Sequence, residues 1–199
     1  MLGAYGTFMN KGVHNKPQFI QAIYDRNGNL LQEFKPESTI AISEELAYVM
    51  SYMLRGATQE KGGTGLGLYR YDILANNEIG AKTGTTQDYS DGWFMGLTPQ
   101  LISGCWVGCE DRQVHFRNFK YGQGARMAMP IFGKYMQRVY DDPKTGIIKQ
   151  DFWEPEEEEK EKYGIITDCE KLLEIQTDSA RMESDVLHFD DEEDDGIGF

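Results

Sequence analysis

The chain of 199 residues has few of the side chains that build metal centres and disulfide frameworks. It contains three cysteines, Cys105, Cys109 and Cys169, without CxxC spacing, and three histidines that lie far apart in the sequence. An odd number of cysteines in such an arrangement argues against a zinc site. If the residues around Cys105 and Cys109 form a strand, their side chains share a face about 13 Å apart, beyond disulfide reach. We therefore expect free thiols, no bound metal and no cofactor.

The chain also lacks a long apolar run and an excess of positive charge. No segment approaches the roughly 20 apolar residues that a membrane helix needs, and Met1 is not followed by a signal-peptide pattern. Lys plus Arg number 20 against 33 Asp plus Glu. We therefore expect neither nucleic-acid binding nor membrane contact from this segment.

The acidic charge is concentrated at one end of the chain. Residues 1–150 hold 16 basic and 14 acidic side chains, a balance of +2, whereas residues 151–199 hold 4 and 19, a balance of −15. Runs of like charge repel one another and bury little apolar surface. We predict a folded domain over residues 1–150 and an acidic, disordered tail over residues 151–199, in which residues 163–176 could form a short helix.

The first third of the chain predicts two helices separated by a hairpin. Apolar residues at helical spacing precede Gly12 without a cap before them, so we expect that Met1 is not the natural start of this fold. Asn27-Gly28 predicts a hairpin with strands over 18–24 and 29–34. Ser43 is a predicted N-cap for a helix that ends at Gly56. Its predicted buried stripe consists of Leu46, Val49, Met50, Met53 and Leu54.

The middle and the second half predict a meander followed by a helix. A glycine-rich loop precedes three apolar runs over 78–86, 92–98 and 100–109, and their short connections favour antiparallel pairing. Residues 125–140 then show an apolar face at helical spacing, with Pro130 in the first turn. The expected fold class is α+β, an antiparallel β-sheet packed with helices. The predicted apolar face consists of Met129, Phe132, Met136 and Val139.

The tripeptide Lys82-Thr83-Gly84 lies within the first of these runs. A phosphate-binding loop needs G-x-x-x-x-G-K-[ST] between a strand and a helix, so that amides at the helix start can hold phosphate. Here Ala81 separates Gly80 from Lys82, and an aromatic run follows instead of a helix. By average residue usage such a tripeptide arises by chance in roughly a few of every hundred chains of this length. A Lys-Thr-Gly strand is, however, one of three motifs of the serine acyltransferases that react with penicillin.

The residues around this tripeptide resemble a known family. The stretch "GAKTGTTQDYSDGWFMGLTPQLISGCWVGCED" is similar to the third, fourth and fifth strands of the transpeptidase domain of class A, bifunctional penicillin-binding proteins. Upstream, "AYGTFMNKG" and "PQFIQAIYDRNGNLL" resemble the segments that precede that strand, and "QGARMAMPIFGKYMQRV" resembles the family's final helix. The resemblance covers residues 3–145 and implies part of a fold like that of the serine β-lactamases.

The resemblance also implies a reaction and a site. The family cross-links peptidoglycan stem peptides that end in D-Ala-D-Ala and binds β-lactams. The resemblance implies that the substrate is bound by Lys82, Thr83, Gly84 and Thr85. It also implies that Lys82 and Thr85 take part in catalysis. Lys82 would supply charge and proton transfer, and the Thr85 backbone N–H would supply half of the oxyanion hole. Gly84 would leave room for the peptide backbone. The implied location is extracytoplasmic, with a membrane anchor upstream.

Strand geometry constrains this site, because alternation sends Lys82 and Thr83 to opposite faces of a flat strand. Only a site at the strand edge can use both. Arg55, Arg70 and the glycine-rich loop could border such a cleft, although a solvated loop accounts for them better. We expect the following aromatic segment to fix the turn and the core rather than contact substrate. Its residues are Thr86, Asp91, Trp93 and Phe94.

The sequence departs from the family in lacking its nucleophile. None of the serines has Lys at the third following position or Asn at the second, so the S-x-x-K and S-x-N motifs are absent. We therefore expect an inactive C-terminal fragment, from a truncated chain or a reading frame begun at an internal Met. We also expect it to be poorly stable alone, because residues 100–109 would present an unpaired apolar edge. The alternative is a non-catalytic interaction module that binds a cell-wall synthesis partner through its sheet or acidic tail.

Overall fold

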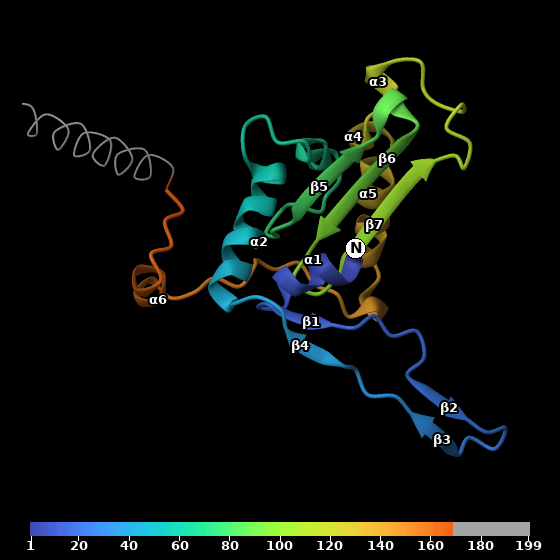
Figure 1. Ribbon diagram of the computed structural model, residues 1–199, viewed down its shortest axis with the longest axis vertical. Coiled ribbons are helices and arrows are strands. Elements are labelled where there is room, and N and C mark those ends of the chain that lie inside the picture. The colour runs from blue at the N-terminus through green and yellow to red at the C-terminus, as the bar shows by residue number, and fades with distance from the viewer. Residues whose placement is uncertain (169–199) are drawn as a thin grey trace, which may run out of the picture. The chain divides into compact units, whose positions relative to one another are not determined.

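The computed structural model describes residues 1–168 (Figure 1). The chain divides into two units, Met1–Pro155 and Glu156–Phe199. In the second unit α6 (Glu157–Lys162) begins with a capping box formed by Glu156 and Glu159. A turn and irregular chain follow as far as Asp168. The short helix predicted over 163–176 is therefore not formed over 163–168, and residues 169–176, with Cys169, lie outside the described residues.

The first unit begins with α1 (Leu2–Met9) and two separate pairs of short strands. β1 (Val13–Asn15) pairs with β4 (Ser38–Ile40), and β2 (Ala22–Tyr24) pairs with β3 (Leu30–Glu33), both antiparallel. In Figure 1 the β2–β3 hairpin extends away from β1 and β4. The predicted hairpin is therefore confirmed, but its strands are shorter than expected. A register shift between Ile23 and Tyr24 interrupts the ladder.

The hairpin turn is organised by one carboxylate. Asp25 accepts hydrogen bonds from the backbone N–H groups of Asn27 and Asn29, at 2.8 and 2.9 Å, and from the Asn29 side chain at 2.8 Å. These hydrogen bonds, led by that of the Asn29 side chain, lower the pKa of Asp25 because they favour its ionised form. The turn is thus specified locally, without support from the rest of the molecule.

The helix α2 (Glu44–Gln59) confirms the predicted Ser43 cap but buries a different face from the one predicted. Leu46 is 49% exposed and Met53 is 65% exposed. The buried residues are instead Ala47, Tyr48, Ser51 and Thr58. The helix also continues one turn beyond Gly56, where Thr58 Oγ1 donates to the carbonyl of Ile79 just before β5. The helix approaches the start of β5 closely at Leu54, since a β-carbon on Gly80 would lie 3.3 Å from Leu54 Cβ.

The main sheet has the predicted meander topology. β5 (Gly80–Thr85), β6 (Asp91–Leu97) and β7 (Ile102–Gly108) are antiparallel in the order β5-β6-β7. η1 (Leu66–Arg70) lies in the glycine-rich segment before β5, and η2 (Gln87–Tyr89) connects β5 to β6. Among the described residues β5 and β7 each have one neighbouring strand, so the expected open edge over 100–109 is present.

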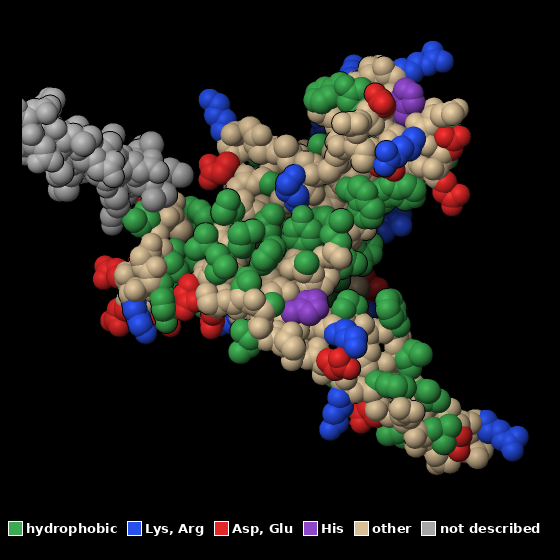
Figure 2. All heavy atoms as spheres, viewed as in Figure 1, with side chains coloured by type: hydrophobic (Ala, Val, Ile, Leu, Met, Phe, Trp, Pro, Cys, Tyr) green, Lys and Arg blue, Asp and Glu red, His purple; other side chains and the backbone are tan. Residues whose placement is uncertain are grey.

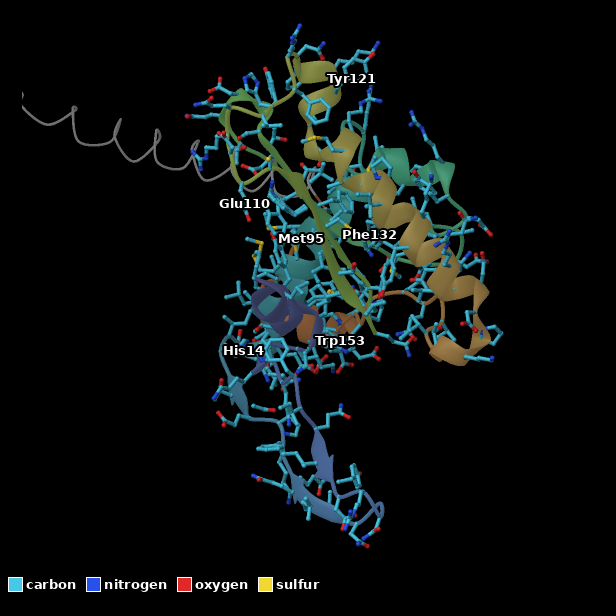
Figure 3. All side chains as sticks on the ribbon, turned by 90° about the vertical axis from the view of Figure 1, so that its right-hand side faces the viewer. His14, Met95, Glu110, Tyr121, Phe132 and Trp153 are labelled. Atoms are coloured by element: carbon cyan, nitrogen blue, oxygen red, sulfur yellow. The ribbon has the colours of Figure 1, made fainter. Side chains whose placement is uncertain are left out.

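The predicted C-terminal helix covers one face of this sheet. It is α5 (Met129–Asp141), with Pro130 in its first turn, and it follows the short helices α3 (Phe119–Gly122) and α4 (Gly124–Met127). Figure 3 shows Phe132 of α5 beside the strands, where its ring centre lies 5.1 Å from that of Phe94. The predicted face of α5 is confirmed, because Met129, Phe132, Met136 and Val139 are all buried.

The chain after α5 returns across the first unit. After η3 (Pro143–Thr145), residues 147–155, here called the strap, run beside α2 and the start of β5. The N–H of Glu78 donates to Gln150, and the N–H of Phe152 donates to the Glu78 carboxylate at 3.0 Å. The Trp153 ring packs edge-on against Tyr48 with centres 5.9 Å apart. The strap therefore joins the end of the unit to its middle.

Large apolar side chains remain on the surface of the first unit. Phe19 is 97% exposed, and further apolar side chains lie exposed along the hairpin. In Figure 2 green side chains gather along the hairpin and over the face that carries α1. No helix within residues 1–168 is long and apolar enough to cross a membrane.

Candidate functional site

The Lys-Thr-Gly-Thr segment occupies the outer half of an edge strand. Gly80 and Ala81 are buried at the start of β5, whereas Lys82 and Thr85 are exposed. β6 pairs with β5 along its whole length, and within residues 1–168 no strand pairs with the other side of β5. The edge of residues 82–85 is therefore available for an extended peptide.

The packing of the sheet itself favours glycine at position 84. A β-carbon at this position would lie 3.2 Å from the β-carbon of Trp93, the residue opposite it on β6. Such a contact is tight, and two backbone-linked atoms cannot easily move apart. The packing of Trp93 thus gives a reason for glycine that is independent of any ligand.

Two threonines of β5 hold two neighbouring segments against the strand. Thr83 Oγ1 donates to Thr64 Oγ1 at 3.2 Å, which joins the strand to the loop before η1. The backbone N–H of Gly124 donates to Thr85 Oγ1 at 3.1 Å, which joins the strand to the start of α4. Because strand residues alternate, Thr83 and Thr85 share one face of β5.

These two segments and β5 enclose a cleft of about 640 Å³. Its two walls meet where Gly67 packs against Met129, whose methyl carbon would lie 2.3 Å from a β-carbon on residue 67. The only charged side chains of the lining are Arg70 and Arg126, and both are exposed. The lining comprises Thr64, Leu66, Gly67, Tyr69, Arg70, Tyr71, Thr83, Thr85, Gln123, Ala125, Arg126, Met129 and Pro130.

Lys82 and Gly84 do not line this cleft, as alternation along the strand requires. The ammonium of Lys82 instead donates to the carbonyl oxygen of Thr83 at 2.7 Å, so the side chain folds back on its own strand. It is exposed and makes no other hydrogen bond within the described residues. Its charge is thus free to turn toward a group on that side of β5.

The connection after β5 is fixed by a small polar network. Thr86 Oγ1 accepts from the N–H of Asp91 at 2.9 Å and also bonds its carboxylate at 3.1 Å. The same carboxylate accepts from the indole N–H of Trp106 at 3.0 Å. Thr86 and Asp91 therefore fix the turn, as predicted, and Phe94 is fully buried as predicted. Trp93 differs from the prediction, because it is 38% exposed on the face opposite α5, beside Trp106.

The sequence did not single out several residues of the cleft. Arg126 lies at the start of the predicted helix, before the first residue of its apolar face. Gln123 precedes that helix, and Thr64 lies in a glycine-rich loop without a pattern. Of the two arginines considered, Arg70 lines the cleft, whereas Arg55 forms an ion pair with Glu78 away from it. The residue that could have indicated the α4 wall of the cleft is Gly124, because a glycine can mark a close approach between backbone segments. A β-carbon there would lie 2.4 Å from the carbonyl oxygens of Gly84 and Trp93.

The thiols and imidazoles of the described residues form no metal centre. Within residues 1–168 no three side chains of His, Cys, Asp and Glu gather closely enough to hold a metal ion. Cys105 and Cys109 are free thiols, and burial raises the pKa of Cys105. His14 contacts Thr7 Oγ1 of α1 at 3.2 Å (Figure 3).

The fold of the first unit is that of a penicillin-binding protein transpeptidase domain. The family model described as the penicillin-binding protein transpeptidase domain matches residues 1–136, so the chain belongs to this family. The match confirms the resemblance seen in the sequence.

Individual relatives agree with this assignment. The chain is 35% identical to penicillin-binding protein 1A of Clostridium novyi over 145 residues, which are 71% of this chain and 15% of that protein. It is 34% identical to penicillin-binding protein 1A of Aquifex aeolicus over 139 residues, covering 70% of this chain and 18% of that protein. The crystal structure of penicillin-binding protein 1A from Haemophilus influenzae has the same fold, with a TM-score of 0.62 at 24% identity. That likeness covers 71% of this chain and 26% of the other. The chain thus spans less than a fifth of the length of these two curated relatives.

Proposed function

We propose that this chain supplies the substrate-binding strand of a peptidoglycan DD-transpeptidase, which cross-links stem peptides by serine acyl transfer. The observation that carries the proposal is the free edge of β5 at residues 82–85, beside a cleft that Thr83 and Thr85 line. The family assignment makes peptidoglycan peptides and β-lactams the expected ligands. The location that follows is the extracytoplasmic face of the cell membrane.

The threonines suit the carboxylate at the end of such a peptide. Thr85 Oγ1 accepts a hydrogen bond from the N–H of Gly124, which leaves its own hydrogen free to donate. Thr83 donates to Thr64 Oγ1, which leaves the Thr64 hydrogen free in the same cleft. Hydrogen bonds from hydroxyl groups to a carboxylate are charge-assisted and therefore strong. An extended peptide on the edge of β5 would bring its C-terminal carboxylate to these groups.

The reacting carbonyl would then lie beside the remaining members of the segment. Lys82 carries a positive charge that can rotate from the Thr83 carbonyl toward an attacking serine and assist proton transfer. The backbone N–H of Thr85 would donate to the oxygen on which negative charge develops, forming half of the oxyanion hole. These roles need no metal and no cofactor from this chain.

The nucleophile must come from other polypeptide, because no serine here belongs to an S-x-x-K motif. We propose that this chain acts within a longer protein whose upstream segment carries the S-x-x-K and S-x-N motifs. This view is supported by the small fraction of its relatives' length that the chain matches, 15% and 18% for the two proteins above. The term "upstream-extended chain" is used below for this chain preceded by the polypeptide that is encoded upstream of Met1, as far as and including the S-x-x-K motif.

Labelling with a fluorescent penicillin tests the proposal. We expect no covalent labelling of the 199-residue chain and stoichiometric labelling of the upstream-extended chain. Lys82→Gln and Thr85→Val should each slow labelling, by about tenfold or more if each removes one hydrogen bond to a charged group. Lys134→Gln, an exposed lysine of α5, is the matched control and should label as the parent does. If the upstream-extended chain does not label, or labels equally fast with Lys82→Gln, the proposal is wrong.

A further inference from the structure

The cleft beside β5 carries more positive charge than one terminal carboxylate requires. Arg70 and Arg126 are both in its lining, and the lining contains no Asp or Glu. Within residues 1–168 neither guanidinium has a carboxylate partner. By contrast, Arg55 of α2 is neutralised by Glu78. The cleft is therefore a local concentration of unpaired positive charge in a chain whose formal net charge is −13.

The two arginines are held on separate walls by the threonines of the site. Arg70 ends η1, which is anchored by the fully buried Leu68 and is joined to Thr83 through Thr64. Arg126 lies in α4, which is joined to Thr85 through the N–H of Gly124. Because both walls are hydrogen-bonded to β5, the backbone that carries each arginine is held relative to the strand edge.

We propose that Arg70 and Arg126 form a second carboxylate-recognition site, which selects acyl-donor peptides that carry a free carboxylate in addition to the C-terminal one. This inference rests on the proposed function, since it assumes that Thr83 and Thr85 hold the terminal carboxylate. Guanidinium groups pair with carboxylates through two parallel hydrogen bonds, which favours them over a point charge for this task. The preferred substrate class is therefore an acidic peptide that ends in D-Ala-D-Ala.

The shape of the cleft suits a peptide better than a small inorganic anion. A volume of about 640 Å³ accommodates several residues rather than one ion. The walls add Leu66, Pro130 and the rings of Tyr69 and Tyr71, which can cover the apolar part of a side chain while the guanidinium groups hold its carboxylate. Both arginines are exposed, so the selectivity should be modest and should fall with added salt.

A competition experiment on the upstream-extended chain tests the inference. Two peptides, acetyl-Ala-Glu-D-Ala-D-Ala and acetyl-Ala-Gln-D-Ala-D-Ala, differ only in one carboxylate and compete with fluorescent penicillin for labelling. In low salt the Glu peptide should halve the labelling rate at about threefold to tenfold lower concentration than the Gln peptide. At about 0.5 M salt this ratio should shrink toward one.

Variants then test whether the preference for the Glu peptide comes from Arg70 and Arg126. The double variant Arg70→Gln with Arg126→Gln should bring the ratio to one, by lowering the potency of the Glu peptide more than that of the Gln peptide. Arg126→Glu should reverse the preference by repelling the added carboxylate. The matched control is Arg138→Gln, which removes an exposed arginine of α5 that lies outside the cleft lining and should leave the ratio unchanged.

The outcomes separate this inference from the proposed function. Normal labelling together with equal potency of the two peptides, or a ratio that survives the double variant, would overturn the second site and leave the transpeptidase proposal standing. A parent protein that never labels would overturn both. An equal loss of potency for both peptides in the double variant, with the ratio preserved, would show that the arginines shape the cleft rather than bind a second carboxylate, and would also overturn the inference.

Discussion

Gly124 shows how one residue without a side chain determines the geometry of the candidate site. Its N–H reaches Thr85 only because α4 touches the backbone of β5 and β6 directly. A β-carbon at this position would overlap two carbonyl oxygens at 2.4 Å, and neither oxygen belongs to a flexible side chain. The wall that carries Arg126 therefore depends on glycine here.

We predict that Gly124→Ala displaces α4 and destabilises the protein. Overpacking against fixed backbone should cost about 1–3 kcal/mol in the free energy of unfolding. Denaturant unfolding of the upstream-extended chain measures this cost, and penicillin labelling should slow in parallel. Gly6→Ala is the control, because its nearest neighbour would be 3.7 Å away and alanine favours a helix interior. Equal stability of the two variants would show that α4 is not held as described.

Cys105 and Cys109 differ in surroundings although both are free thiols on or after β7. Cys105 is partly buried toward α5, and burial raises its pKa, so less of it is thiolate at neutral pH. Cys109 is exposed. We predict that iodoacetamide modifies Cys109 first at about pH 7.5, and that a denaturant such as urea brings the two rates together. Peptide mapping by mass spectrometry gives both rates, and faster modification of Cys105 in the native protein would contradict the packing of β7 on α5.

At the scale of elements, the strap is a feature that no sequence pattern indicated. Glu78, at the entry to β5, pairs with Arg55 of α2 and accepts a hydrogen bond from the N–H of Phe152 in the strap. One carboxylate thus links three segments that are distant in sequence. Both partners of the ion pair are largely shielded from solvent, so its removal leaves a poorly solvated charge.

We predict that Glu78→Ala opens the strap and loosens α2. The loss should be about 1–3 kcal/mol, because Arg55 and the N–H of Phe152 both lose their acceptor. In this variant the Phe152 amide should exchange its hydrogen faster, through local opening that does not require global unfolding. Glu37→Ala is the matched control, since it breaks the exposed Lys16–Glu37 pair and should cost less than about 1 kcal/mol. Unchanged protection of Phe152 would contradict the proposed link.

Elements whose signal is local were predictable from the sequence. The meander followed from short turns between apolar runs, the hairpin from Asn-Gly, and the face of α5 from residues such as Phe132 at helical spacing. The face of α2 was not, because the largest apolar residues there, including Met53, are exposed while Ala47 and Ser51 are buried. Hydrophobicity alone does not reveal which face of a helix the rest of the fold will cover.

The candidate site divides in the same way. Lys82 to Thr85 form a contiguous motif, so both the segment and its edge strand could be inferred from residue order. The walls of the cleft could not, because Thr64 and Gly124 reach β5 from segments 19 and 39 residues away in the sequence. Such long-range hydrogen bonds leave no periodic trace in the sequence.

At the scale of the whole molecule, the first unit exposes surfaces that isolated domains usually cover. Within the described residues β7 ends the sheet with one free edge, and its strand partner β6 carries Trp93 beside Trp106 on a partly exposed face. Ile40 and Phe19 are almost fully exposed. Open strand edges and exposed apolar side chains favour association and reduce the free energy gained on folding.

We predict that the 199-residue chain alone unfolds over a broad temperature range, whereas the upstream-extended chain shows one sharp, cooperative transition. Added polypeptide that covers the edge of β7 and the Trp93–Trp106 face would contribute roughly 25 cal/mol for each Å² of apolar surface removed from water. Scanning calorimetry measures the transitions, and binding of a dye that reports exposed apolar surface should decrease in the longer chain. A sharp transition of a monomeric 199-residue chain, with little dye binding, would mean that these surfaces need no cover, and the chain would then be a domain that is stable by itself.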